Sequence, residues 1–156
     1  EMHGYRCDMR TDTEVFAYAA DLLVRRHGLT PRLAAAVFAA PLWDAIDRMP
    51  PEEHAVYRAL RQTYGSLLMN GPFTIILARG GEMMGLSDRV RLRPLVAATR
   101  GSLLYVSSEL SAIGAIEAEL DAVSIPMGGQ PVIGRLGEPP VLEEPLPTEP
   151  AVAGGA

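Results

Sequence analysis

A cysteine and a histidine lie four residues apart near the start of the chain, at a spacing that permits shared chemistry. On an extended strand, positions i and i+4 lie on the same face, so His3 and Cys7 could form a nucleophile–base pair. The alternative is that Cys7 is a buried structural thiol, since free cysteines often behave as small core residues. We expect the buried thiol.

Other acids and histidines do not form a recognisable site. The neighbours in Glu52-Glu53 and in Glu143-Glu144 point in different directions, so neither pair makes an acid/base dyad. The three histidines, His3, His27 and His54, are dispersed, and one cysteine does not provide zinc-ligand spacing. We therefore predict no metal site. His27 is expected to complement the dipole at a helix end.

Thr11-Asp12-Thr13-Glu14 has the pattern of a helix start. Thr11 can cap the exposed N–H groups, while Glu14, three residues on, reaches back to complete a capping box. Asp12 would lie in the first turn, where a carboxylate stabilises the helix dipole by up to about 1 kcal/mol. This segment places two acids close together at one helix end.

Composition excludes several function classes. All 14 cationic residues are arginine, which rules out a lysine Schiff base and a P-loop lysine. The net charge of −5 and the absence of a basic stripe argue against nucleic acid as a partner. At 156 residues, with 21% charged and 48% hydrophobic residues, the chain is expected to fold as one domain.

Neither an oxidising compartment nor a membrane is indicated. One cysteine cannot form an internal disulfide. The longest apolar run, Leu33–Trp43, is about half of what spans a bilayer, and Pro41 interrupts it. The first residues do not have a signal-peptide pattern. A cytoplasmic location without membrane contact is the expectation.

The first half of the chain is predicted to be mostly helical. A strand at 3–8 precedes a helix that begins at Thr11 and ends at His27-Gly28, with Val15, Tyr18, Ala19, Leu22 and Leu23 on its buried face. A second helical stretch begins at Thr30-Pro31 and breaks near Pro41. A third helix begins at Pro50-Pro51 and ends near Leu68.

The second half reads as short strands separated by turns. We predict strands at 73–78, 82–87, 95–98, 103–107 and 131–136, with a short helix at 109–119. Hairpin turns are expected at Gly80-Gly81 and Gly128-Gly129. The apolar run at 74–77 suggests a strand covered on both faces. Helices outside a meander of antiparallel strands make an α+β fold, and residues 138–156 form a Pro- and Glu-rich tail or linker.

Five motifs occur in an order that is not generic. They are the segments Thr11–Val15, Gly71–Phe73, Asp88–Leu95, Ser107–Glu109 and Pro126–Val132. Together they resemble the C-terminal portion of the glutaminase domain in class II (N-terminal-nucleophile) glutamine amidotransferases. In the amino-acid sequence of these motifs, the chain is most similar to the amidotransferase subunits of archaeal-type glutamate synthases and N-methylglutamate synthases. The resemblance extends from residue 11 to residue 132.

The resemblance implies both a fold and a chemistry. The fold is an Ntn-hydrolase-like α/β/β/α sandwich of antiparallel sheets, of which residues 1–137 would form the C-terminal portion. In that family an N-terminal cysteine attacks the side-chain amide of glutamine, with its own α-amine as the base. The products are glutamate and ammonia, and the ammonia passes to a synthase partner. No cofactor is implied.

Asp12 is the one residue onto which a family role carries over. It matches the acid of the family's (S/T)-D-T-E-V motif, which binds the α-ammonium group of glutamine. The nucleophile, a substrate-binding arginine and an Asn-Gly oxyanion pair belong to the family's N-terminal half and would precede Glu1. Cys7 lies where the family has no catalytic residue. We therefore assign no catalytic residue within this chain.

The remaining motif residues are expected to be structural. Thr11 and Glu14 shape the helix start around Asp12. An arginine–carboxylate interaction could hold the loop before Pro94, and Asp88, Arg93 and Glu109 are the candidates for it. The sequence does not determine which acid pairs with Arg93.

The expected function is to supply part of a domain that hydrolyses glutamine for a synthase partner, with no activity in this chain alone. An alternative is a degenerate, non-catalytic amidotransferase-like subunit with a structural or regulatory role. Removing the first half of a sandwich would leave inner strands without neighbours, and open strand edges attract other chains. Self-association of the isolated chain is a further expectation.

Overall fold

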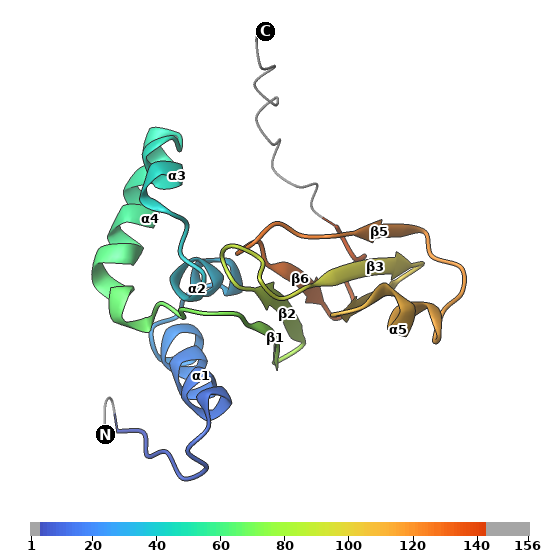
Figure 1. The fold of residues 1–156 in the computed structure, drawn as a ribbon, viewed down its shortest axis with the longest axis horizontal. Helices are drawn as coiled ribbons and strands as arrows, with labels where there is room; N and C mark the ends of the chain where they lie inside the picture. Colours follow the sequence, from blue (N-terminus) through green and yellow to red (C-terminus); the bar gives the residue numbers. More distant parts are fainter. Residues whose placement is uncertain (1–3, 143–156) are drawn as a thin grey trace, which may run out of the picture.

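The computed structural model describes residues 4–142, which form a group of helices followed by two small sheets (Figure 1). The helices are α1 (Asp12–Ala20), α2 (Pro31–Phe38), α3 (Trp43–Asp47), α4 (Pro51–Tyr64) and α5 (Leu110–Gly114). The strands are β1 (Thr74–Arg79), β2 (Glu82–Ser87), β3 (Val96–Arg100), β4 (Leu103–Ser107), β5 (Ala122–Ser124) and β6 (Val132–Arg135). The predicted α+β class is confirmed.

Local capping signals determine where the helices begin and end. The side-chain oxygen of Thr11 accepts the backbone N–H of Glu14 at 3.2 Å, and Thr30 caps α2 in the same way, with Pro31 at its first position. A π-helical turn, Asp21–Arg26, extends α1 as far as Gly28, whose φ of 71° confirms the predicted left-handed end. These helix starts and this end were predicted correctly.

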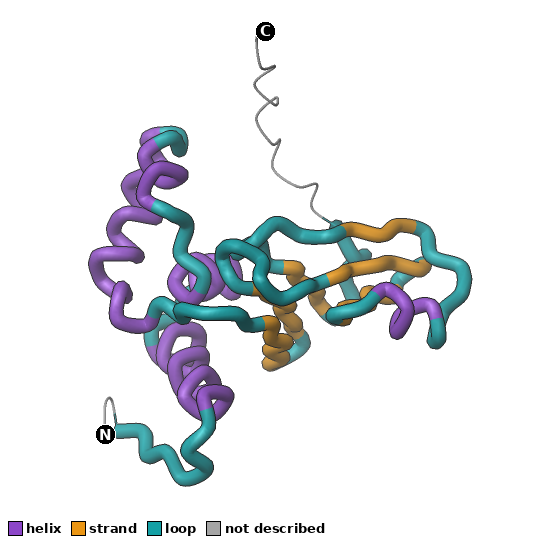
Figure 2. Tube along the Cα trace, in the orientation of Figure 1, coloured by secondary structure: helices purple, strands orange, loops and turns teal. Residues whose placement is uncertain are grey.

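Several of the predicted elements and core positions are wrong. Residues 4–10 form a loop rather than a strand, because the N–H groups of Asp8, Met9 and Arg10 bond to a side chain instead of to a neighbouring strand (Figure 2). Val15 is 51% exposed, and Phe16 takes its place in the core. The helix predicted at 109–119 ends at Gly114, and β5, which we did not predict, follows it.

Both sheets are antiparallel and three-stranded. Sheet A has the order β1-β2-β6, and sheet B has the order β4-β3-β5. In sheet A, Ile76 pairs with Gly85, and Gly85 pairs with Val132, so these three residues share one face. The tight turn at Gly80-Gly81 joins β1 to β2 and confirms the predicted hairpin.

One face of sheet A packs on the helices. The main hydrophobic cluster combines residues of the helices with residues of sheet A: Phe16, Leu23, Val37 and Phe38 with Ile75, Leu77, Met84, Leu86 and Ile133. The rings of Phe16 and Phe38 lie 4.4 Å apart at their centres, in the middle of this layer. This cluster is the largest apolar core in the described part of the chain, and it anchors α1 and α2 on the sheet.

The opposite face of sheet A packs on sheet B. A β-carbon added to Gly85 would lie 2.8 Å from Val106 Cγ1, and one added to Gly134 would lie 2.7 Å from Leu104 Cδ2. The side chains of β4 therefore fit directly onto glycines of β2 and β6. On its outer face, sheet B carries α5, where Val96, Ala98 and Ile113 form a separate cluster.

The two sheets are offset sideways. Because β4 lies over β2 and β6, no strand that residues 4–142 contribute to sheet B lies over β1. Ile76 of β1 points toward sheet B, yet it is 55% exposed. The prediction that residues 74–77 are covered on both faces is therefore wrong within residues 4–142, since only the helix side is covered.

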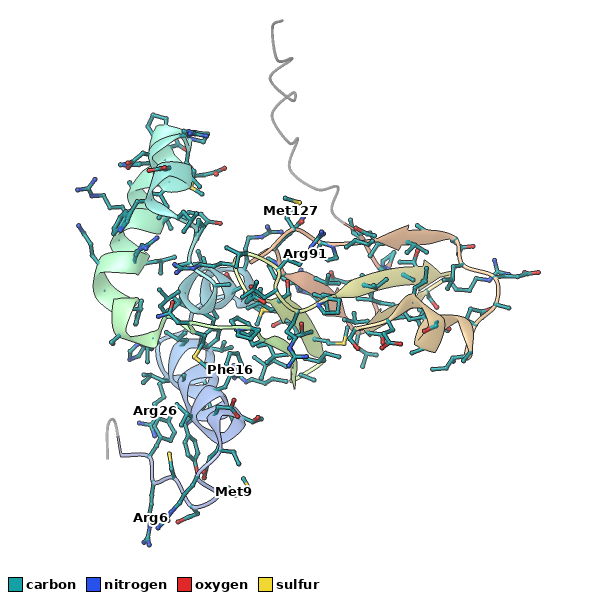
Figure 3. The ribbon with its side chains drawn as sticks, in the orientation of Figure 1. Arg6, Met9, Phe16, Arg26, Arg91 and Met127 are labelled. Carbon is teal, nitrogen blue, oxygen red and sulfur yellow. The ribbon has the colours of Figure 1, made fainter. Side chains whose placement is uncertain are left out.

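The glycines at 128 and 129 connect the sheets. They lie between β5 of sheet B and β6 of sheet A, so the hairpin predicted there is wrong. A β-carbon at Gly128 would lie 2.5 Å from the carbonyl oxygen of Arg89 and 2.8 Å from the nitrogen of Arg91. Figure 3 shows Met127 and Arg91 together at this crossing. Backbone packs on backbone here, which leaves no room for a side chain.

Replacing Gly128 with alanine should destabilise the fold by about 1–3 kcal/mol or more, because the new methyl group meets main-chain atoms that cannot move independently. Urea unfolding of both proteins measures the difference. Gly114→Ala is the matched control, because a β-carbon added at Gly114 would meet no neighbouring atom within 4 Å. Equal losses in the two variants would contradict the tight packing at residue 128.

Candidate functional site

The start of α1 and the loop before it form the candidate site. Asp12 is the first residue of α1, and its side chain is exposed. Its Oδ1 accepts the backbone N–H of Thr13 at 2.8 Å. Oδ2 has no hydrogen-bond partner within residues 4–142. Oδ2 of Asp12 can therefore accept a hydrogen bond from a cationic group.

Glu14 lies two residues on and has the opposite environment. Its side chain is 5% exposed. Oε1 accepts the N–H of Asp8 at 2.8 Å, and Oε2 accepts those of Met9 and Arg10 at 2.8 and 3.0 Å. Only the Thr11 half of the expected capping box forms, because Glu14 accepts the N–H groups of the three residues before Thr11 instead of that of Thr11. The hydrogen bond from Asp8 makes the largest contribution to lowering the pKa of Glu14. Burial of the carboxylate acts in the opposite direction, but the hydrogen bonds outweigh it.

The loop held by Glu14 contains a strained residue. Arg10 has a φ of 56°, in the left-handed region that side chains other than glycine seldom adopt. The hydrogen bond from the N–H of Arg10 to Glu14 maintains this conformation two residues before Asp12. The direction in which the chain enters α1, and so the position of Asp12, depends on the Glu14 carboxylate.

Aromatic residues support the outer side of the same loop. The Tyr18 hydroxyl lies 2.9 Å from the carbonyl oxygen of Arg6 and 3.2 Å from Oε1 of Glu14. The ring of Tyr5 stacks on that of Tyr18 at 4.8 Å, and the guanidinium of Arg26 lies 4.3 Å above Tyr5. Figure 3 shows Arg26 beside this loop and Arg6 at its outer end. These contacts attach the loop before α1 to Tyr18 within α1 and to Arg26 at the end of the π-helical turn.

Asp21 completes the contacts on Tyr5. The Tyr5 hydroxyl donates to Asp21, and Arg25 donates to both carboxylate oxygens of that residue. The hydrogen bonds from Arg25 and then from Tyr5 hold the pKa of Asp21 well below its usual range. The sequence analysis missed Tyr5, Tyr18 and Asp21, because their partners come from a loop that was predicted as a strand.

The expectation for Cys7 was wrong. The thiol is exposed in the loop rather than buried, because residues 4–10 turn outward instead of adding a strand to a sheet. His3, its possible partner, lies outside the described residues, as do Glu143 and Glu144. Within residues 4–142, no group of three or more His, Cys, Asp or Glu side chains could hold a metal ion. In the same part of the chain, no helix is long and apolar enough to cross a membrane.

Asp88 organises a second loop, between β2 and β3. Its carboxylate is 2% exposed and accepts the N–H groups of Val90, Leu92 and Arg93 at 3.2, 3.0 and 3.0 Å. Burial alone would raise the pKa of Asp88, but the hydrogen bonds from this backbone outweigh it and lower the pKa. Asp88 therefore bonds to Arg93 through the main chain of Arg93.

The motif residues do not converge on one site. The Asp88 loop lies near the C-terminal end of α2, where a β-carbon at Gly129 would meet both Ala39 and Arg89, and away from the first turn of α1 (Figure 1). Glu109 is the residue before α5; its N–H bonds to Ser107 Oγ at 3.2 Å, and its carboxylate accepts the Ser111 hydroxyl at 3.2 Å. Only Thr11, Asp12 and Glu14 lie together, at the start of α1.

A pocket of about 400 Å³ lies at the open edge of sheet A, beside β6. Its walls include Ala97 and Ser124 of sheet B, Val132 of β6 and the start of α2 at Pro31. Leu142 also lines it and packs on the cluster between the sheets. The pocket lies at the β6 edge of sheet A, and Ile76 lies at the opposite edge, on β1.

Comparison with known proteins identifies an archaeal relative of this chain. No family model matches the chain. A protein of Archaeoglobus fulgidus described as uncharacterized is 56% identical to this chain over 136 residues. The match covers 87% of this chain and 36% of that protein, so the chain spans about a third of its relative's length.

Replacing Glu14 with glutamine should loosen the loop, because the neutral amide loses the charge-assisted hydrogen bonds from residues 8–10. Amide hydrogen exchange at Asp8, Met9 and Arg10 should become at least about tenfold faster. In the wild type, the pKa of Glu14 is lower in the folded protein than in the unfolded chain, so the Glu14 carboxylate stabilises the fold at pH values above its unfolded-state pKa. This stabilisation is lost as the pH falls through the folded-state pKa of Glu14, which lies below the ordinary pKa of a glutamate.

The exposed Glu52, in the first turn of α4, provides the control. Glu52→Gln should leave exchange at residues 8–10 unchanged at every pH. If Glu14→Gln had no more effect than Glu52→Gln, the Glu14 carboxylate would not hold the loop.

Proposed function

We propose that this chain is the C-terminal portion of a class II glutamine amidotransferase domain, which hydrolyses glutamine and passes ammonia to a synthase partner. The observation that carries the proposal is the pair of facing, offset sheets between α1–α2 on one side and α5 on the other. This layer order fits an incomplete α/β/β/α sandwich of the Ntn-hydrolase type.

The offset supports the idea that strands are missing from both sheets. A strand added at the β4 edge of sheet B would cover Ile76, which is 55% exposed. A strand added at the β6 edge of sheet A would extend into the space lined by Ala97 and Ser124. Neighbouring strands lie about 4.8 Å apart, so one strand on each side would bring the sheets into register.

In this proposal Asp12 binds the substrate and does not break a bond. Its exposed carboxylate would accept hydrogen bonds from the α-ammonium of glutamine at the N-terminal end of α1. A cysteine at the mature N-terminus of the preceding polypeptide would attack the side-chain amide and release ammonia. The Archaeoglobus relative extends well beyond the matched 136 residues, which is compatible with a longer functional unit.

A non-catalytic module is the second candidate. Cys7, the one cysteine of this chain, is exposed in a loop six residues from Glu1 and has no role in the proposed chemistry. The gene sequence before Glu1 separates the two candidates. An N-terminal cysteine followed by an arginine and an Asn-Gly pair would favour the enzyme, and a start codon at Met2 would favour the structural or regulatory subunit.

Replacing Asp12 with asparagine should raise the KM for glutamine by about 10- to 100-fold, since a charge-assisted hydrogen bond contributes about 1.5–3 kcal/mol. The assay uses the chain joined to the polypeptide that precedes Glu1 and measures the release of glutamate. The kcat should change less than the KM, because the interaction is with a part of the substrate that does not react.

Asp44 offers a matched control, because it is an exposed acid in the first turn of α3. Asp44→Asn should leave the KM unchanged. Each variant loses one interaction with a helix dipole, so both should unfold at nearly the same urea concentration as the wild type. An unchanged KM in Asp12→Asn would remove Asp12 from the substrate site.

The isolated chain should self-associate, because within residues 4–142 the outer edges of β4 and β6 pair with no strand and Ile76 is exposed. Sedimentation at increasing protein concentration should show species larger than a monomer. Ile76→Thr should reduce the association, while the longer protein that includes the preceding polypeptide should not associate through these edges. A stable monomer of the isolated chain at high concentration would argue against missing strands.

A further inference from the structure

Two half-buried arginines lie near the C-terminal end of α2. Arg61, on α4, donates to the carbonyl oxygen of Pro41, and its guanidinium lies 4.3 Å from the centre of the Trp43 ring. Arg89, in the loop after β2, donates to Oδ1 of Asn70 at 3.4 Å. Both arginines keep further N–H donors, because a guanidinium has five.

Backbone contacts explain why these segments converge. The N–H of Met69 donates to the carbonyl oxygen of Phe38 at 2.9 Å, which places Asn70 at the end of α2. A β-carbon at Gly129 would lie 2.9 Å from the carbonyl oxygen of Ala39 and 3.6 Å from Cα of Arg89. The chain before α3, the loop after β2 and the turn at Asn70 are therefore packed together.

Neither arginine has an acidic partner in the described part of the chain. Several other arginines there do form ion pairs: Arg25 and Arg26 with Asp21, Arg100 with Glu119 and Asp121, and Arg135 with Glu82. Within residues 4–142, no carboxylate forms an ion pair with Arg61 or Arg89, although the chain's net charge is −5. Burial, and then the positive charge of Arg89, lower the pKa of Arg61. A negatively charged group near both arginines would compensate the burial of the Arg61 charge and reduce its repulsion by Arg89.

We propose that Arg61, Arg89 and Asn70 form a binding site for a carboxylate. The planar guanidinium groups can each donate two parallel hydrogen bonds to carboxylate oxygens, and the Asn70 amide NH₂ can add another. Leu42 and Trp43, which are 53% and 44% exposed, provide an apolar border for the carbon chain that carries the carboxylate. This proposal does not depend on the glutaminase assignment.

The carboxylate could belong to a free small molecule or to an acidic side chain of a partner protein, and two probes distinguish these sources. Glutarate represents the small molecule. The acetylated and amidated tripeptide Leu-Glu-Leu represents a side chain with apolar neighbours. Trp43 is the single tryptophan of the chain and stacks on Arg61, so its fluorescence reports directly on the site.

Each probe is titrated into the chain at constant ionic strength, with chloride as the reference anion. At least one probe should give a saturable change in Trp43 fluorescence, and Arg89→Gln should weaken its binding by at least about tenfold. Arg79→Gln, at an exposed arginine at the end of β1, is the control and should leave the affinity unchanged. Arg61→Lys, which keeps the charge but loses the planar donors, is a second variant and should also weaken binding.

Saturation by glutarate would indicate a small-molecule ligand, and saturation by the tripeptide alone would indicate a partner's side chain. The proposal is overturned if neither probe gives a saturable change. It is also overturned if the folded Arg89→Gln and Arg61→Lys variants bind as tightly as the wild type.

Discussion

The close approach of the two sheets at Gly85 and Gly134 is the contact on which the rest of the fold depends. Val106 and Leu104 of β4 occupy the space that side chains at these positions would fill. This contact fixes β4 over β2 and β6 and so produces the sideways offset of the sheets. The exposed Ile76 on one side and the pocket beside β6 on the other both follow from it.

The start of α1 shows how one short motif can place two acids in opposite environments. Glu14 points back toward the loop, where three backbone N–H groups stabilise its charge. Asp12 is exposed and keeps one oxygen without a partner within residues 4–142. The buried acid thus fixes the backbone from which the exposed acid is presented. A binding role for Asp12 requires this rigidity, since a loosely held carboxylate loses affinity to entropy.

Local sequence signals predicted the local structure well. Thr11, Thr30 and Gly28 marked helix ends, and Gly80-Gly81 marked a hairpin, because each acts through a hydrogen bond or a φ angle within a few residues. The errors concern long-range pairing. Whether residues 4–8 form a strand, and which sheet receives β5 or β6, depends on partners far along the chain. The site was predicted only in part for the same reason: the roles of Tyr5 and Tyr18 require a loop that the apolar pattern does not reveal.

Hydrogen exchange on the chain with and without its preceding polypeptide tests most directly whether the two sheets are incomplete. If strands from that polypeptide complete the sheets, the edge amides of β4 and β6 that exchange rapidly in the isolated chain should become protected in the longer protein. The inner strands β2 and β3 should change little. Equal exchange at these edges in both proteins would contradict the account.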